Sequence, residues 1–201
     1  MSLTRRDAAT FREPLARAVL DLRDMTTFFR RLIGVLMLEA SAYEEIEAHR
    51  DAGMQSVQIV LAVTAAGGGA GMGLGVIGVP GFVTGAVVAL GGWLVWVSLI
   101  ATLGTTTFAE PQTKSNAREL LRTLGFAAAP GVFLIFAAIR TAAPLVFAIV
   151  SVWMIAAAVM AVRQALDFKS VTRAIAVCGV SWALSIGFVA VMAAILTSPV
   201  E

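Results

Sequence analysis

Residues 82–103 read FVTGAVVALGGWLVWVSLIATL, a run of 22 amino acids without a charged side chain. At 1.5 Å per residue, a helix of this length rises about 33 Å, which is enough to cross the roughly 30 Å hydrocarbon core of a bilayer. The run therefore predicts a transmembrane helix, and it sets the class of protein for the rest of the chain.

Four further apolar runs of similar length flank this one. The connections are short, so that the third and fourth runs must form an antiparallel hairpin. We expect an all-α integral membrane protein with five transmembrane helices in residues 55–196, followed by an external tail at 197–201. The predicted spans are 55–79, 82–103, 121–139, 142–162 and 174–196.

The composition agrees with a membrane protein. Hydrophobic residues make up 59% of the chain and charged residues only 14%, outside the averages for soluble domains. Residues 1–54 hold 17 of the 28 charged residues and no apolar core of a signal peptide. This segment is therefore predicted to be a cytoplasmic amphipathic helical unit in front of the spans.

The basic residues also predict an orientation. With a cytoplasmic N-terminus, 14 of the 15 Lys and Arg residues lie inside and only Arg140 lies outside, which satisfies the positive-inside rule. The C-terminus is then external. A chain with 13 Arg and 2 Lys is typical of a high-GC bacterium, so the bacterial inner membrane is the expected location.

Two short helices are predicted before the spans. After Glu13-Pro14, apolar residues recur at steps of three and four up to Leu36, which indicates an amphipathic helix. Its apolar face either packs on the protein's own bundle or contacts lipid, and the sequence does not decide between the two. A capping box at Ser41–Glu44 predicts a second helix from Tyr43 to about Ala52, ended by Gly53.

Glycines at intervals of four mark a packing face. Small residues at this spacing let two helix backbones approach closely in a membrane. A formal G-x-G-x-x-G at 73–78 lies within the first span and has no acidic residue about twenty positions later, so it does not indicate nucleotide binding. The predicted helix-packing residues are Gly67, Gly71, Gly75, Gly81 and Gly85.

No residue pattern indicates catalysis. His49, the single histidine, has Glu45 four residues earlier, and an exposed salt-bridged helix is favoured over a metal or proton site. Cys178 is the only cysteine, which excludes an intramolecular disulfide. We expect a non-enzyme with no catalytic, cofactor or metal site, no nucleic-acid partner and no identified small-molecule substrate.

Two segments are candidates for function. Arg163, Asp167, Lys169 and Arg173 follow the fourth span and form either a cytoplasmic anchor or a partner-docking surface, with Arg163 and Asp167 spaced to pair on a continuing helix. Pro130 and Gly131 interrupt the third span and are candidates for a helix break, a feature that transporters use to line sites.

The order of segments resembles the bacterial branch of the Yip-domain (Ypt/Rab-interacting) membrane protein family. The similarity rests on residues 31–38 (RLIGVLML), 92–96 (GWLVW), 115–131 (SNARELLRTLGFAAAPG) and 153–177. It implies five spans, a cytoplasmic N-terminus and a role in binding partners. The acidic, tyrosine-containing signature of eukaryotic members is not evident, so Rab binding is not implied.

Two functions follow as hypotheses. The first is a non-catalytic membrane scaffold or accessory subunit that contacts membrane lipids and binds protein partners or a second copy of itself. The alternative is a small transporter or channel centred on the break at Pro130.

Overall fold

The computed structural model describes residues 22–73, 78–113 and 117–197. Every regular element in these residues is helical, which confirms the predicted all-α class. Residues 22–36 form a helix, here called the N-terminal helix. The remaining elements are α2 (Ala40–Ala48), α3 (Ala52–Gly73), α4 (Val79–Thr105), α5 (Ala117–Ala127), the 3₁₀ helix η1 (Ala129–Ala138), α6 (Ala143–Ala165) and α7 (Val171–Thr197).

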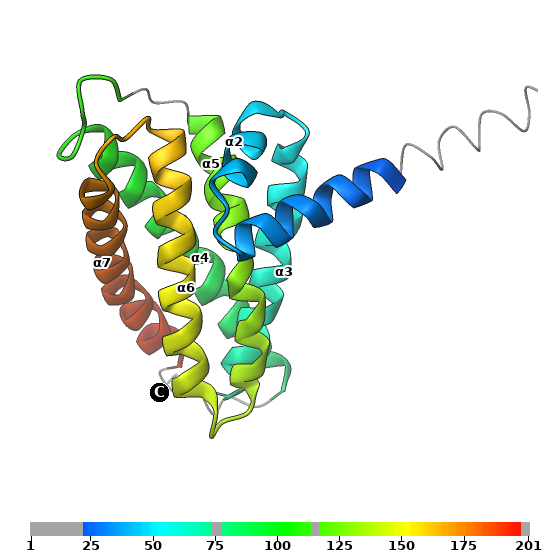
Figure 1. The fold of residues 1–201 in the computed structure, drawn as a ribbon. Helices are drawn as coiled ribbons and strands as arrows, with labels where there is room; N and C mark the ends of the chain where they lie inside the picture. The colour runs from blue at the N-terminus through cyan, green and yellow to red at the C-terminus, as the bar shows by residue number, and fades with distance from the viewer. Residues whose placement is uncertain (1–21, 74–77, 114–116, 198–201) are drawn as a thin grey trace, which may run out of the picture.

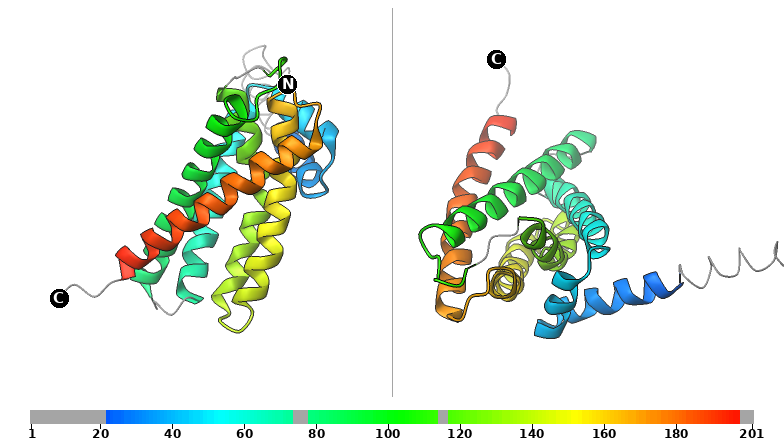
Figure 2. Two further views of the ribbon diagram at one scale, coloured as in Figure 1. Left: turned by 90° about the vertical axis from the view of Figure 1, so that its left-hand side faces the viewer. Right: turned by 90° about the horizontal axis from the view of Figure 1, so that it is seen from above.

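The long helices form an up-and-down bundle, and the N-terminal helix projects sideways from it (Figure 1). One end carries α2 and the connection between α6 and α7, and we call it the α2 end. The turn between η1 and α6 lies at the opposite end, which we call the far end. Viewed from above, the N-terminal helix points away from the bundle axis, whereas α2 covers one corner of the bundle (Figure 2).

Three described helices are long and apolar enough to cross a membrane: Val79–Thr105, Ala143–Ala165 and Val171–Met192. They coincide with the second, fourth and fifth predicted spans. The count rises to four if α5 and η1 together form one bent span. The prediction of five spans is therefore not supported, because α3 does not qualify. Gln55, Gln58 and several glycines lower its hydropathy, and residues 74–77 of the predicted first span lie outside the described residues.

The predicted third span is a bent pair of helices. Arg118–Ala127 and Ala129–Ala138 meet at an angle of 41°. Pro130 has no N–H to continue an α-helix, and Gly131 N–H donates to Ala128 O at 2.7 Å, a 3₁₀-type bond. The break predicted at Pro130 therefore marks the change from α-helix to 3₁₀ helix.

The boundaries near α2 differ from the prediction. The helix begins at Ala40 after Glu39, which makes no side-chain capping bond, so the expected capping box at Ser41 is not formed. The helix ends at Ala48, and Gly53 lies inside α3 rather than at a C-cap. Tyr43 and Ile46 of α2 are buried in the core, so tertiary packing rather than local capping fixes this helix.

Candidate functional site at the base of the N-terminal helix

Arg31 is the most deeply buried charged residue described, with 2% of its surface exposed. It lies on the N-terminal helix one turn before Val35, which is fully buried. A buried guanidinium requires ionic and hydrogen-bonding partners, because desolvation disfavours an unpaired charge. Its surroundings supply both, from elements distant in sequence.

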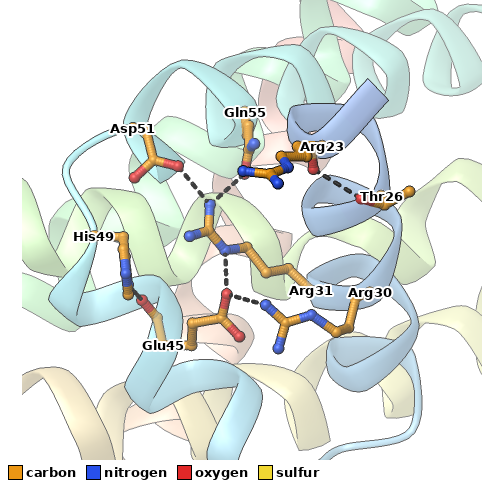
Figure 3. A network of polar contacts seen from close by, with 8 residues as sticks. All are labelled: Arg23, Thr26, Arg30, Arg31, Glu45, His49, Asp51 and Gln55. Atoms are coloured by element: carbon orange, nitrogen blue, oxygen red, sulfur yellow. Dashed lines mark hydrogen bonds and ion pairs between the residues drawn. The ribbon is translucent and has the colours of Figure 1, made fainter. Parts of the chain in front are cut away.

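Three side chains receive hydrogen bonds from Arg31 (Figure 3). Its Nε donates to Glu45 Oε1 at 3.0 Å, and its Nη1 donates to Asp51 Oδ2 at 2.9 Å and to Gln55 Oε1 at 2.8 Å. Glu45 belongs to α2, Asp51 to the turn after it and Gln55 to α3. One guanidinium thus ties the N-terminal helix to the next two helices.

The outer side of this network is open to solvent. Arg30, whose side chain is 66% exposed, donates from Nη2 to Glu45 Oε1 at 2.7 Å. Burial raises the pKa of Asp51, but the hydrogen bond and the charge of Arg31 outweigh it and hold that pKa below its usual value. The Asp51 carboxylate therefore stays ionised near neutral pH, and its bond to Arg31 persists.

A second contact fixes the C-terminal end of the N-terminal helix. The indole Nε1 of Trp153 donates to Leu36 O at 3.1 Å. The last carbonyls of a helix have no partner inside it, so this bond satisfies one of them. Trp153 lies in the middle of α6 and also stacks on Phe133 at 5.5 Å between ring centroids. The N-terminal helix is thus held at two points five residues apart.

The face of the N-terminal helix opposite Arg31 is exposed. Four large apolar side chains at helical spacing, which we call the apolar stripe, are each more than half exposed: Leu22, Met25, Phe29 and Ile33. The apolar face predicted from the sequence also includes Leu32 and Leu36, and these two residues pack against the core of the bundle. The predicted face is therefore divided between the bundle and the exposed stripe, and Phe28, Arg31 and Val35 lie on the bundle side.

The predicted glycine face lies between α3 and α4. A Cβ placed on Gly71 would lie 2.8 Å from Gly85 Cα and also against Gly81 O, and one on Gly85 would lie 2.8 Å from Gly71 Cα. A Cβ on Gly67 would meet Ala89 and the Gly85 carbonyl. The two backbones therefore touch at these glycines. Gly75 lies outside the described residues.

The four basic and acidic residues after the fourth span are divided between two places: Arg163 and Asp167 line one pocket, whereas Arg173 and the backbone of Lys169 contact Glu110. Arg163 and Asp167 make no ion pair, because α6 ends at Ala165 and Asp167 adopts a left-handed conformation with φ of 52°. Asp167 and Lys169 are exposed, whereas Arg163 is only partly exposed and its Nε is buried without a hydrogen-bond partner in the described part of the chain. The predicted pair thus fails because the helix stops too early.

Lys169 and Arg173 belong instead to a cluster around Glu110. The backbone N–H groups of Lys169 and Ser170 donate to the Glu110 carboxylate at 3.1 and 3.3 Å, and Arg173 Nε lies 3.8 Å from it. Burial raises the pKa of Glu110, but these donors outweigh it and hold that pKa below its usual value. Glu110 therefore binds the start of α7, where an anionic group is favoured.

An apolar cavity of about 290 Å³ lies in the centre of the bundle. Trp93, Trp96 and Trp182 line it together with Gly71, Gly85 and aliphatic side chains, and no charged residue is among its lining residues. Pro130 and Gly131 are buried nearby in η1, where a Cβ on Gly131 would meet Val63 of α3. The helix break serves close packing at this point.

His49 and Glu45 do not form a metal pair. The His49 ring nitrogen Nδ1 lies 2.8 Å from Glu45 O, whereas the Glu45 carboxylate points toward Arg30 and Arg31. In the described part of the chain, no three residues among His, Cys, Asp and Glu are placed to hold a metal ion.

Sequence reasoning missed the two polar clusters. Arg31 follows Phe28 by three residues and precedes Val35 by four, so helical spacing places it on the same face as these two apolar residues. That spacing could have predicted its burial. The partners of Arg31 lie 14 to 24 residues away and those of Glu110 lie about 60 residues away, and no local pattern identifies them. Comparisons with family models, curated proteins and solved structures found no match.

Proposed function

We propose that this protein is a non-catalytic, multi-pass membrane scaffold that binds a protein partner at its α2 end. The observation that carries the proposal is the buried Arg31 network. Three side chains accept hydrogen bonds from Arg31 and fix the N-terminal helix relative to α2 and α3. A helix fixed in this way presents a defined surface to a partner. The N-terminal helix therefore acts as a rigid arm.

The apolar stripe of this arm lies in lipid. Trp153 is ten residues from the start of α6 and twelve from its end, which places it about 15 to 18 Å from either end of the helix. Its bond to Leu36 O brings the end of the N-terminal helix to the same depth. Ile33 and Met37, which are 56% and 70% exposed there, then face hydrocarbon instead of water.

The α2 end faces the cytoplasm in this proposal. The basic residues of the N-terminal helix, α5 and the α6–α7 connection gather at this end, whereas Arg140 is exposed at the far end. That distribution is the one that the positive-inside rule requires. We also propose that α3 crosses the bilayer as a fifth span, because α4 and η1 pack along it and shield its glycines.

The polar surface at the α2 end offers a protein partner charges of both signs. Glu44, Arg50, Asp167 and Lys169 are exposed there, on α2 and on the two adjoining connections. Such a mixed polar face is typical of a rim that sets orientation and specificity. Membership of the Yip-domain family, whose resemblance implies partner binding, is part of the same proposal.

A transporter centred on Pro130 is the second candidate. The central cavity supports it only for an apolar cargo, because its lining contains no charged residue to select or release an ion. The single break in α5–η1 is packed against α3 and is not open to a polar path. We therefore place this function second.

Purification of the full chain in mild detergent, followed by mass spectrometry, tests the scaffold. We expect a partner at a fixed stoichiometry that is lost with Arg31→Gln and retained with Pro130→Ala. The proposal fails if the same partners appear at the same level with Arg31→Gln. It also fails if the purified protein in liposomes supports solute flux that Pro130→Ala abolishes.

A further inference from the structure

A second cavity, of about 820 Å³, opens at the α2 end beside the start of α3. It lies between the end of α2, the first turns of α3 and the first turns of α5. Three arginines line it: Arg50, Arg118 and Arg122. Two carboxylates, Glu47 and Glu119, also belong to its lining, so the formal charge of the lining is +1.

Two of these arginines, Arg122 and Arg50, differ in their burial and in the hydrogen bonds and ion pairs that they make. Arg122 is 9% exposed and donates from Nη2 to the backbone carbonyl of Glu47, while its Nε is buried without a hydrogen-bond partner among the described residues. A buried guanidinium nitrogen without a partner is destabilising unless a ligand or water satisfies it. Arg50 is exposed and makes no ion pair with any residue in the described ranges. Within the part of the chain that the structure describes, one arginine of the cavity thus has a buried N–H group without an acceptor, and another has an exposed guanidinium without an ion pair.

Glu47 is the acidic residue of the lining whose charge is disfavoured by burial. Burial raises the pKa of Glu47, with further contributions from Glu119 and Asp167, which oppose the lowering by Gln164 and Arg122. Burial therefore disfavours the charged form of Glu47. Neutralising this residue should make the cavity more favourable for an anion.

Apolar side chains adjoin the basic ones on the lateral surface of the bundle. Val57 and Leu121 line the same cavity and are 51% and 46% exposed. Leu61 continues this surface along α3 and is 59% exposed. A ligand that occupies the cavity therefore meets arginines at the α2 end and an apolar helix surface toward the middle of the bundle.

We propose that this cavity binds the phosphate headgroup of an anionic phospholipid, with the acyl chains lying along Val57, Leu61 and Leu121. The combination of basic donors at the membrane boundary and an adjoining apolar surface matches a two-part ligand of this kind. A free phosphate uses only the arginines, and an acidic protein segment does not need the apolar surface. The site shares Arg50 with the polar surface proposed for a protein partner, but it does not involve the Arg31 network. Arg31→Gln therefore tests the scaffold and Arg122→Gln tests the lipid site.

Lipid titration of the purified full chain in a neutral detergent tests this site. The probe is dioleoyl phosphatidylglycerol, with dioleoyl phosphatidylcholine and glycerol phosphate as comparison ligands, and native mass spectrometry measures the bound fraction. We expect phosphatidylglycerol to bind more tightly than either comparison. Arg50→Gln should weaken its apparent affinity about fivefold, since one basic side chain near an anionic lipid contributes about 1 kcal/mol.

Further variants sharpen the test. Arg122→Gln should weaken binding at least as much as Arg50→Gln, and Glu47→Gln should strengthen it. Arg140→Gln is the matched control, because it removes one exposed arginine at the far end, and it should leave the affinity unchanged. If Arg122→Gln does not fold, Arg50→Gln alone decides, because its side chain is exposed and forms no ion pair with the described residues.

Three results would overturn the proposal. One is equal weakening by Arg140→Gln and Arg50→Gln, which indicates general charge attraction to the micelle. Another is binding of glycerol phosphate as tight as that of the lipid, which assigns the cavity to a soluble phosphate. The third is loss of a protein partner with Arg50→Gln while lipid binding is unchanged, which assigns the arginines to a protein interface.

Discussion

At the α3–α4 interface, Gly71 and Gly85 bring two backbones into direct contact, whereas at the α2 end Arg31 joins three segments through its guanidinium. The glycine contact contains no charge, and its stability depends on van der Waals packing at close approach. The arginine contact depends on hydrogen bonds between ionised groups, and it lies where its carboxylate partners still reach solvent, since Asp51 is 60% exposed.

In the membrane placement proposed above, the difference reflects the surroundings of each contact. Inside a bilayer, burial of apolar surface does not drive helix association, so small residues that allow close approach take over. At the membrane boundary, ionised groups are less expensive to place, and their directional bonds fix the angle of a projecting helix. The glycine interface therefore holds the bundle together, and the arginine network orients the arm.

Gly71→Leu should produce the largest effect. Its Cβ would lie 2.8 Å from Gly85 Cα and against the Gly81 carbonyl, so backbone has to move rather than a flexible side chain. We expect a loss of at least about 3 kcal/mol in packing stability, at the upper end of overpacking penalties. Thermal unfolding in detergent measures it, and membrane insertion should be unaffected.

Gly187→Leu is the matched control for this variant. Gly187 lies in the spanning part of α7, and a Cβ added there would have no neighbouring atom within 4 Å, so leucine faces open space. It should leave the unfolding temperature unchanged or raise it slightly. Equal losses from the two variants would show that leucine acts through the helix itself and not through the α3–α4 contact.

Arg31→Met should have the next largest effect and should act on the arm. It leaves Asp51 without its cation, whereas Glu45, 20% exposed, keeps only the ion pair with Arg30. Removing one partner of a buried pair is strongly destabilising, and the solvent access of both carboxylates reduces the expected loss to about 2–3 kcal/mol. Faster hydrogen exchange or proteolysis in residues 22–36, with an intact bundle, is the expected readout.

Arg30→Met provides the control at the neighbouring position. Arg30 bonds the same Glu45 oxygen, but its side chain is 66% exposed, so its ion pair should contribute less than about 1 kcal/mol. If Arg30→Met releases the N-terminal helix as fully as Arg31→Met does, the prediction is wrong. The burial of Arg31 would then not explain its larger contribution.

The sequence predicted these two regions unequally. The spacing of Gly67, Gly71, Gly81 and Gly85 identified the residues that lie at the α3–α4 contact, because helical periodicity places residues four apart on one face. The Arg31 network brings together residues from three elements. Its hydrogen bonds join partners up to 24 residues apart, and that pairing depends on how the N-terminal helix turns at Leu38.

The same contrast applies to the spans. Continuous apolar runs predicted α4, α6 and α7, where length and composition are sufficient. The same runs did not separate the amphipathic α5 from the 3₁₀ helix η1. They also treated the glycine-rich α3 as a span equal to the others. Hydropathy describes a segment's preference for lipid, and it does not give the residue at which α6 ends, Ala165, which separates Arg163 from Asp167.

Trp153→Phe tests the second attachment of the arm and should have a moderate effect. Phenylalanine retains the stacking on Phe133 but removes the donor to Leu36 O. The expected loss is about 1 kcal/mol, the net value of a typical hydrogen bond. Hydrogen exchange at the amides around residues 36–38 should increase. Trp93→Phe is the control, because the buried Trp93 Nε1 has no partner to lose, and a larger effect there would contradict the assignment.

The smallest effect should come from Glu110 and should depend on pH. The folded protein holds the pKa of Glu110 below its ordinary value of 4.5, so the stability that this carboxylate contributes is complete above pH 4.5 and is lost as the pH falls through the lower, folded value. The backbone N–H groups of Lys169 and Ser170, Arg173 Nε and Gln112 Nε2 face the carboxylate. Wild type should therefore unfold at a higher temperature than Glu110→Gln near neutral pH, and the difference should shrink on acidification.

Subtracting the two curves removes the titration of other acids such as Asp51, whose partners are unchanged in the variant. A difference that persists unchanged well below pH 4.5 would mean that Glu110 acts by its shape and neutral hydrogen bonds, and then the ionic description of the α2 end would apply to Arg31 alone.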